Sequence, residues 1–394
     1  MKVIIAGGGI GGMSAAAALL SRGIEVELYE QTKELREVGA GIQLSPNGSR
    51  ALDSLGVFEH LRTLSCEPER KEYRLWNTGQ SWPMFDLGDV AVEQYGYPYL
   101  TVYRPDLLDS LAARVRELDP TAIRLGQKVT GFEQDDRSAS LCLADGSKAT
   151  GDVVLGADGW RSVVRTALWG DYAPAFSGMV AWRGLIPWQA LPPHQQEMLA
   201  LMWIGPHAHS VSYPLHGGAI LNFVATIEGK TWTSSASSEP GSKDECHADF
   251  AGWHDDLHQL IDLTPTLLKW ALVRWEPITR WSLGRATLSG DAAHATLPFL
   301  AQGAVHSIED GVVLGRALES FDDPVEALKR YEGARAERTA AMVRGASANT
   351  HRFHALELAT PEGAAAHMER EFSPGPIADR YSWLYTYDAA TAPL

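Results

Sequence analysis

Four residues near the N-terminus have the types and the spacing that could hold a phosphate-containing cofactor. Gly7, Gly9 and Gly12 follow the apolar run 3–6, and Glu30 stands eighteen residues beyond Gly12. Glycines at this spacing permit a tight turn, the close approach of a pyrophosphate and close packing of helix on strand. A helix N-terminus offers unpaired N–H groups to phosphates, and a carboxylate after the next strand receives ribose hydroxyls. The pattern favours a dinucleotide site over a structural glycine turn, and it fits FAD and NAD equally.

Two further short motifs follow in the chain. Asp158-Gly159 comes directly after the apolar run 153–157, and Asp291 lies in the segment Gly-Asp-Ala-Ala-His at 290–294. Asp-Gly is also a common surface turn, and the second motif could be a plain turn before a helix. Their order behind the glycine-rich turn favours a shared binding site.

Four residues in the middle of the chain alternate with a spacing of two. They are His207, His209, Val211 and Tyr213. If this segment is a strand, all four side chains project to one face. His209 could then take a proton from a bound molecule, because an imidazole titrates near neutrality, and Tyr213 could hydrogen-bond to or stack on that molecule. An isolated histidine is otherwise a solvent-facing or satisfied residue. We interpret His294 that way, as packing at a helix start, and place His306 on a helix surface.

The elements that position these residues can be predicted in outline. Residues 2–30 predict a strand, a glycine turn, a helix and a second strand, which form one βαβ unit. From 178 to 226 the helical period gives way to alternation rich in Trp and Tyr, which predicts an antiparallel sheet in a second domain. The chain returns to the first domain near Arg285, and helices are expected at 302–318 and 324–339.

Composition narrows the class of protein. The chain has 394 residues, of which 45% are hydrophobic and 21% charged, as in ordinary globular proteins. A net charge of −15 with no Lys/Arg cluster argues against a nucleic-acid partner. The apolar runs are shorter than the ~18 residues of a spanning helix, which argues against integral membrane association. The three cysteines are isolated and lack metal-ligand spacing, so we expect free thiols, no metal site and a cytoplasmic location.

The three motifs in this order resemble the single-component FAD-dependent aromatic hydroxylases, the group A flavin monooxygenases. The resemblance covers nearly the whole chain. Further segments are similar to the subgroup that contains 3-hydroxybenzoate 6-hydroxylase, 6-hydroxynicotinate 3-monooxygenase and salicylate hydroxylase. These segments are 38–48, 95–99, 181–184, 298–304 and 381–388.

The resemblance implies roles for individual residues. Asp291 would contact the ribityl chain of FAD, and the helix that opens near Gly303 would point at the flavin pyrimidine ring, where its dipole stabilises negative charge. Asp158 would belong to the motif that bridges the flavin and nicotinamide regions. The other residues that the resemblance assigns to the flavin site are Gly41, Gln43, Arg104, Val129, Pro298 and Ala304. Arg104 could instead be an exposed charge beside a helix, and Val129 an ordinary strand residue.

Two positions depart from the subgroup. Gln43 stands where the 6-hydroxynicotinate enzyme has a histidine, and Pro298 stands where the 3-hydroxybenzoate enzyme has a catalytic glutamine. The identity of the substrate is therefore left open between these relatives.

The expected fold is α/β. It comprises a Rossmann-like FAD-binding domain of the glutathione-reductase type, an inserted antiparallel β-sheet substrate domain and a C-terminal helical segment. The predicted FAD-binding domain takes residues 1–78, 100–175 and 276–345, the substrate domain 79–99 and 176–275, and the helical segment 346–394.

The expected activity is hydroxylation of a small aromatic compound, a phenolic or hydroxypyridine carboxylic acid, through a flavin C4a-hydroperoxide. Bound FAD, transient NADH or NADPH, and O2 would take part, and a homodimer is compatible with the sequence. Two alternatives remain open: a urate-type purine hydroxylase of the same fold, and a non-catalytic flavin-binding redox sensor.

Overall fold

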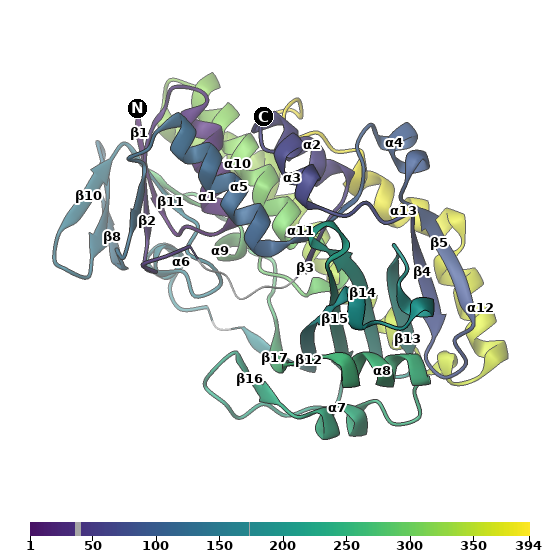
Figure 1. The fold of residues 1–394 in the computed structure, drawn as a ribbon. Coiled ribbons are helices and arrows are strands. Elements are labelled where there is room, and N and C mark those ends of the chain that lie inside the picture. The colour runs from purple at the N-terminus through teal and green to yellow at the C-terminus, as the bar shows by residue number, and fades with distance from the viewer. Residues whose placement is uncertain (36–40, 173) are drawn as a thin grey trace.

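The protein is described by a computed structural model over residues 1–35, 41–172 and 174–394. A parallel sheet with helices stacked on it occupies one side of the molecule, and a larger sheet occupies the other (Figure 1). The parallel sheet has five strands in the order β18-β11-β1-β2-β7. Its strands are β1 (Lys2–Ala6), β2 (Glu25–Glu30), β7 (Ile123–Leu125), β11 (Val153–Gly156) and β18 (Ala286–Leu288).

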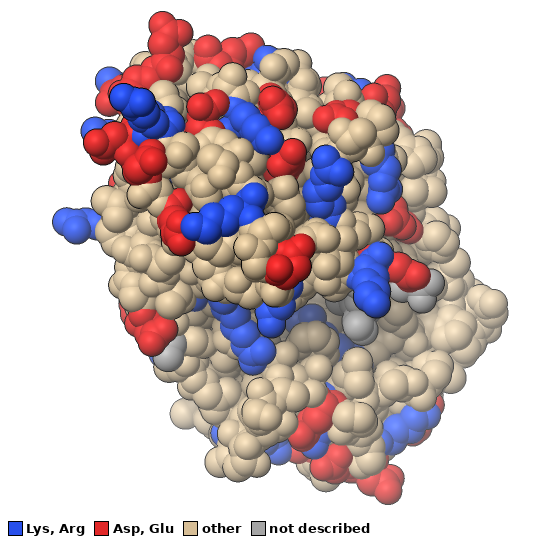
Figure 2. Space-filling view, turned by 90° about the vertical axis from the view of Figure 1, so that its left-hand side faces the viewer, with Lys and Arg blue, Asp and Glu red and all other residues tan. Residues whose placement is uncertain are grey.

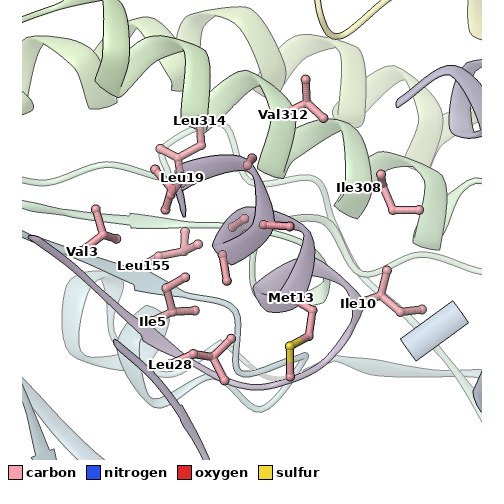
Figure 3. Close-up of a cluster of buried hydrophobic side chains, with 14 of the residues drawn as sticks. Val3, Ile5, Ile10, Met13, Leu19, Leu28, Leu155, Ile308, Val312 and Leu314 are labelled. Carbon is pink, nitrogen blue, oxygen red and sulfur yellow. The ribbon is translucent and has the colours of Figure 1, made fainter. Parts of the chain in front are cut away.

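The central strand of this sheet is apolar throughout because both of its faces are covered. Val3, Ile4 and Ile5 are completely buried, as expected for a strand inside a parallel sheet. Helix α1 (Ile10–Leu20) packs between the sheet and helix α10 (Gly303–Ser320), as Figure 3 shows. The two helices approach closely because α10 carries a glycine at the crossing. A Cβ at Gly311 would lie 2.6 Å from the backbone nitrogen of Ala15.

The larger sheet has eight strands in the order β16-β17-β12-β15-β14-β13-β4-β5. All neighbouring strands are antiparallel except β13 and β4, which are parallel. The strands are β4 (Arg70–Leu75), β5 (Ser81–Asp86), β12 (Ala175–Pro187), β13 (Ala200–Gly205), β14 (Ala208–Leu215), β15 (Ile220–Ile227), β16 (Ser238–Gly241) and β17 (Leu267–Arg274).

Two small sheets and further helices complete the fold. The small sheets are formed by β8 (Val129–Gln134), β9 (Ala139–Leu143) and β10 (Lys148–Gly151), and by β3 (Gly41–Leu44) and β6 (Leu100–Tyr103). The other α-helices are α2 (Pro46–Ser54), α3 (Phe58–Leu64), α4 (Asp89–Tyr95), α5 (Arg104–Leu118), α6 (Val163–Trp169), α7 (Lys243–Asp249), α8 (Asp255–Leu263), α9 (Asp291–His294), α11 (Pro324–Phe353), α12 (Pro361–Phe372) and α13 (Pro374–Tyr385). Across the described ranges, none of the helices has the length and hydropathy needed to cross a membrane.

Two elements, one strand and one helix, do not follow the predicted domain boundaries. Strand β4 pairs with β13 in the large sheet, although the predicted boundary at residue 78 assigned it to the FAD-binding part. Helix α11 continues without a break across the predicted boundary after residue 345, because apolar residues on its inner face stay buried as far as Phe353. The division into domains otherwise stays a prediction.

A buried charge network joins α10 and α11. Glu309 and Asp310 of α10 are completely buried, and Arg335 of α11 lies 2.8 Å from a carboxylate oxygen of each. Burial acts to raise the pKa of the Glu309 carboxyl, but Arg335 and its neighbours outweigh it and lower that pKa to about 2. Asp310 also accepts a hydrogen bond from the backbone nitrogen of Gly290 (3.0 Å), and its Oδ2 lies 2.7 Å from Nε2 of His294.

His306 belongs to this network, so its predicted position on a helix surface is wrong. Its side chain is completely buried, and its Nδ1 lies 3.4 Å from the Arg335 guanidinium. The reason is that α10 is covered by α1, α2 and α11 together. From α2, Asn47 donates a hydrogen bond to Oε1 of Glu309 at 2.7 Å.

We predict that Arg335→Met lowers the free energy of unfolding by about 3–5 kcal/mol, because it removes the fully buried guanidinium that pairs with both buried carboxylates. Arg330→Met on the same helix is the matched control. It removes an exposed ion pair with Glu326 (2.8 Å), and should cost less than about 1 kcal/mol. Urea unfolding followed by tryptophan fluorescence measures both, and losses of equal size would contradict a structural role for the network.

Candidate active site

A cavity of about 410 Å³ extends from the N-terminus of α1 to the N-terminus of α10. A hollow at which Lys and Arg side chains gather is visible in the space-filling view (Figure 2). The sequence-predicted residues that line the cavity are Gly9, Gly41, Gln43, Arg104, Tyr213, Asp291, Pro298, Gly303 and Ala304. Gly7, Gly12, Glu30, Val129 and Asp158 lie outside this lining, and His209 lines an adjoining cavity. Residues 38–40 of the predicted flavin-side loop lie outside the described residues.

The glycine-rich turn has the geometry that its sequence predicts. Gly7 has φ +103°, a conformation that favours glycine, and a Cβ at Gly12 would collide with the carbonyl oxygen of Gly7. A Cβ at Gly9 would meet nothing within 4 Å, so this position is open to the cavity. Oε2 of Glu30 accepts a hydrogen bond from the backbone nitrogen of Gly8 at 2.8 Å, which places the carboxylate beside the turn.

The second motif has one buried carboxylate oxygen without a hydrogen bond. Oδ2 of Asp158 accepts from the backbone nitrogen of Val163 at 2.7 Å, while Oδ1 is buried and has no partner among the described residues. Burial raises the pKa of this carboxyl. Arg165 ties this motif to the third one, because it donates to the carbonyl oxygens of Trp160 (2.6 Å) and Ala292 (3.1 Å).

These features fit an extended dinucleotide that carries a ring. The helix ends at both extremes of the cavity supply N–H groups and positive partial charge, and Asp291 is exposed toward the cavity between them. The unpaired Oδ1 of Asp158 is an acceptor of the kind that a ribose or ribityl hydroxyl satisfies. Ala301, next to the start of α10, has φ +55°, and such a strained non-glycine conformation is typical of functional sites.

A second cavity of about 90 Å³ adjoins the first and lies over the large sheet. Both cavities are lined by Gly41, Gln43, Arg183, Tyr213, Pro298 and Ala301. The floor of this inner cavity is formed by β12, β15, β14, β13 and β4, and its roof by the short helix η4 (Pro298–Leu300). Lys71 of β4 and Arg183 of β12 therefore stand four strand spacings apart, or ~19 Å, at opposite ends of the floor.

Lys71 was not identified in the sequence analysis. It is 6% exposed, and no described residue forms an ion pair with it. Burial lowers the pKa of its ammonium group to about 8. The flanking Arg70 and Arg74 both pair with Glu72 on the other face of β4. The alternation of side chains in 70–75 is the signal that could have separated Lys71 from the charges on the other face.

His209 and Tyr213 line the inner cavity, and His207 does not. His209 is 2% exposed, and burial lowers the pKa of its imidazole well below the usual value. The prediction that His207 shares their face is wrong: this residue is left-handed (φ 62°) and occupies the turn before β14. Pro206 fixes φ near −65° at the first turn position, so the left-handed conformation falls on His207.

Tyr213 is held against the strand that carries two predicted flavin-side residues. Gly41 donates its backbone N–H to Oδ1 of Asn222 at 3.0 Å, and a Cβ at Gly41 would collide with the Tyr213 ring. Burial raises the pKa of the Tyr213 phenol, although a hydrogen bond from Gln43 opposes this. Oε1 of Gln43 accepts a hydrogen bond from Tyr99 at 2.7 Å. Tyr213 therefore stays protonated at neutral pH and can donate a hydrogen bond.

Comparison with known proteins agrees with this geometry. The model of a family described as an FAD binding domain matches residues 1–346. The chain is 37% identical to a 3-amino-4-hydroxybenzoate 2-monooxygenase of Streptomyces platensis, over 99% of this chain and 96% of the relative. It is 35% identical to a 3-hydroxybenzoate 6-hydroxylase of Polaromonas naphthalenivorans, over 98% and 96%.

Among solved structures, HpxO of Klebsiella pneumoniae in complex with FAD and uric acid is similar at a TM-score of 0.84. That match has 28% identity and covers 97% of each chain. The predicted α/β fold and the predicted resemblance are confirmed. The chain belongs to the FAD-binding monooxygenases and is an FAD-dependent aromatic-ring monooxygenase.

Proposed function

We propose that this monooxygenase hydroxylates a small phenolic or hydroxypyridine carboxylic acid that binds in the inner cavity. The observation that carries the proposal is the charge of the lining. Lys71 and Arg183 line this cavity, and none of its described lining residues is Asp or Glu. Burial without a counter-ion disfavours the charged form of a lysine. A substrate carboxylate bound beside Lys71 would stabilise the charged ammonium group. The named substrates of the two ~35–37% identical relatives are both aromatic acids.

The chemistry at the hydroxyl end of the substrate is assigned to His209 and Tyr213. His209 is neutral near pH 7 because burial lowers the pKa of its imidazole, so it can accept the proton of a substrate hydroxyl. Tyr213 can donate a hydrogen bond to the same ring. Phe299, whose ring lies edge-on to His209 with centroids 4.9 Å apart, helps to exclude water.

The larger cavity of about 410 Å³, which runs between the N-termini of α1 and α10, is proposed to hold FAD. The dinucleotide would lie across Gly7, Gly9 and Gly12, with its ribose at Glu30 and its adenine near the backbone of Val129. Its ribityl chain would lie at Asp291, and its ring near Gly303 and Ala304. The other residues proposed to contact it are Gly41, Gln43, Arg104, Asp158 and Pro298. When bound, FAD takes a hydride from NADH or NADPH and activates O2; the protein binds, orients and excludes water.

A purine hydroxylase is the second candidate, and the solved complex with uric acid favours it. Uric acid is also an anion and would suit a cavity lined by Lys71 and Arg183 without a carboxylate. A screen of NADH and NADPH oxidation over monocyclic aromatic acids and uric acid separates the two candidates. We expect an aromatic acid to stimulate coenzyme oxidation and to yield a hydroxylated product. Stimulation by uric acid alone would replace the proposal, and oxidation without any oxygenated product would overturn both.

The role of Lys71 is tested by comparing the binding of an aromatic acid with that of its uncharged carboxamide analogue. We predict that Lys71→Met weakens binding of the active acid about 10–150-fold, as expected for loss of a charge-assisted hydrogen bond. Binding of the corresponding primary carboxamide should change little. In the wild type, acid affinity should fall as the pH rises through about 8, where Lys71 loses its proton. Lys148→Met, at an exposed lysine, is the control; equal weakening of acid and amide would contradict the assignment.

The role of Asp291 is tested through the cofactor. Asp291→Ala removes an acceptor for ribityl hydroxyls, a loss of about 1–3 kcal/mol, so FAD should bind roughly ten- to hundredfold more weakly. Asp291→Asn keeps one side-chain oxygen and should lose less. Titration of the FAD-free protein with FAD measures both, and an unchanged dissociation constant in Asp291→Ala would mean that this motif is only a turn.

A further inference from the structure

Three side chains form a hydrogen-bonded row, here called the file, that leads from the inner cavity to the protein surface. Nδ1 of His209 on β14 lies 2.6 Å from Nε2 of His354 at the C-terminal end of α11. Nδ1 of His354 lies 2.8 Å from Oε1 of Glu228, directly after β15. His209 is 2% exposed. The side chain of His354 is also 2% exposed, whereas that of Glu228 is 30% exposed. The file therefore begins in the site and ends in solvent.

The file has one consistent order of donors and acceptors while Glu228 is ionised. A hydrogen bond from His354 lowers the pKa of the Glu228 carboxyl, so this group is a carboxylate that can only accept. His354 must then donate through Nδ1 and accept through Nε2, and His209 must donate through Nδ1. The lone pair of His209 therefore lies on Nε2, which no described residue occupies with a hydrogen bond.

The backbone holds the three elements of the file in place. The backbone nitrogen of His207 donates to the carbonyl oxygen of His354 at 3.2 Å, and that of Glu228 donates to the carbonyl oxygen of His207 at 2.9 Å. The exposed His207 ring lies 3.4 Å from the other carboxylate oxygen of Glu228. These contacts fix α11 against the β13–β14 turn and keep the outer end of the file beside water.

We propose that His354 and Glu228 form a proton relay that carries the substrate's hydroxyl proton from His209 to solvent. The proposal rests on the proposed function, because the substrate hydroxyl supplies the proton. The substrate O–H bond breaks and its proton binds Nε2 of His209. The Nδ1 proton of His209 passes to Nε2 of His354, and the Nδ1 proton of His354 passes to Glu228, which releases it to water. The net result is the transfer of one proton from the substrate to water; both histidines change tautomer, no electrons are transferred, and the reverse passage of a proton restores the file.

The relay is tested without turnover, by ionisation of a coloured ligand. 4-Hydroxy-3-nitrobenzoate is a phenolic acid whose phenolate absorbs at longer wavelength than its phenol. It is mixed with the oxidised holoenzyme in weak buffer, and the growth of the phenolate band is followed by stopped flow. Glu228→Gln keeps an oxygen that accepts from His354 but cannot take up a proton. We expect it to slow ionisation about tenfold or more, within the range for loss of a positioned proton acceptor.

Further variants separate a relay from a packing role. His354→Gln should slow ionisation as much as Glu228→Gln, His209→Ala should slow it at least as much, and Glu228→Asp should restore most of the rate. His351→Gln, at an exposed histidine on α11, should match the wild type. The deficits should vanish when the pH exceeds the pKa of the probe in solution, because no proton then has to leave. A packing defect would persist there.

The outcomes also separate this proposal from the proposed function. If the wild type binds and ionises the probe and Glu228→Gln does so at the same rate, the relay is overturned and the proposed function stands. If the wild type neither binds the probe nor oxidises NADH faster with any aromatic acid, the proposed function fails and the relay fails with it.

Discussion

The pairing of Arg335 with two adjacent buried carboxylates is the interaction on which the site depends. Asp310 fixes the backbone of Gly290 and the ring of His294, which together orient the third motif. Glu309 holds Asn47 at the start of α2. Carboxylates buried in this way are tolerated only with good ionic and hydrogen-bonded partners. One network thus sets where the cofactor-side loops stand relative to α10.

The inner cavity depends on a second constraint, which is the covering of the large sheet by the C-terminal helices. Asn349 of α11 donates to the carbonyl oxygen of Phe299 at 2.8 Å and so fixes the roof at η4. Tyr73, two residues beyond Lys71 in sequence, contacts Phe372 of α12 with ring centroids 4.5 Å apart. Lys71 lies on the same strand and is buried as well, and that burial gives the cavity its cationic end.

Local patterns carried the sequence analysis as far as the glycine turn, the βαβ unit and the alternation of His209 with Tyr213. Each of these is fixed within a few residues, by φ limits or by a period of two. His306 is misplaced because its burial comes from α1 and α2, which lie far from α10 in the sequence. The contact between His209 and His354 joins residues 145 positions apart, and no pattern within either segment announces it. For His207 the error is the reverse. Its spacing fits the alternation of β14, but the residue precedes the first residue of that strand.

The central claim is that the enzyme inserts oxygen into an aromatic acid, with FAD in the larger cavity and the acid in the inner cavity. The most direct test supplies ¹⁸O₂ to the holoenzyme with NADH and the aromatic acid that stimulates its oxidation, and measures label in the product by mass spectrometry. We expect one labelled oxygen on the ring for nearly every NADH consumed. Coenzyme oxidation that yields only hydrogen peroxide, or a hydroxylated product without label, would contradict it.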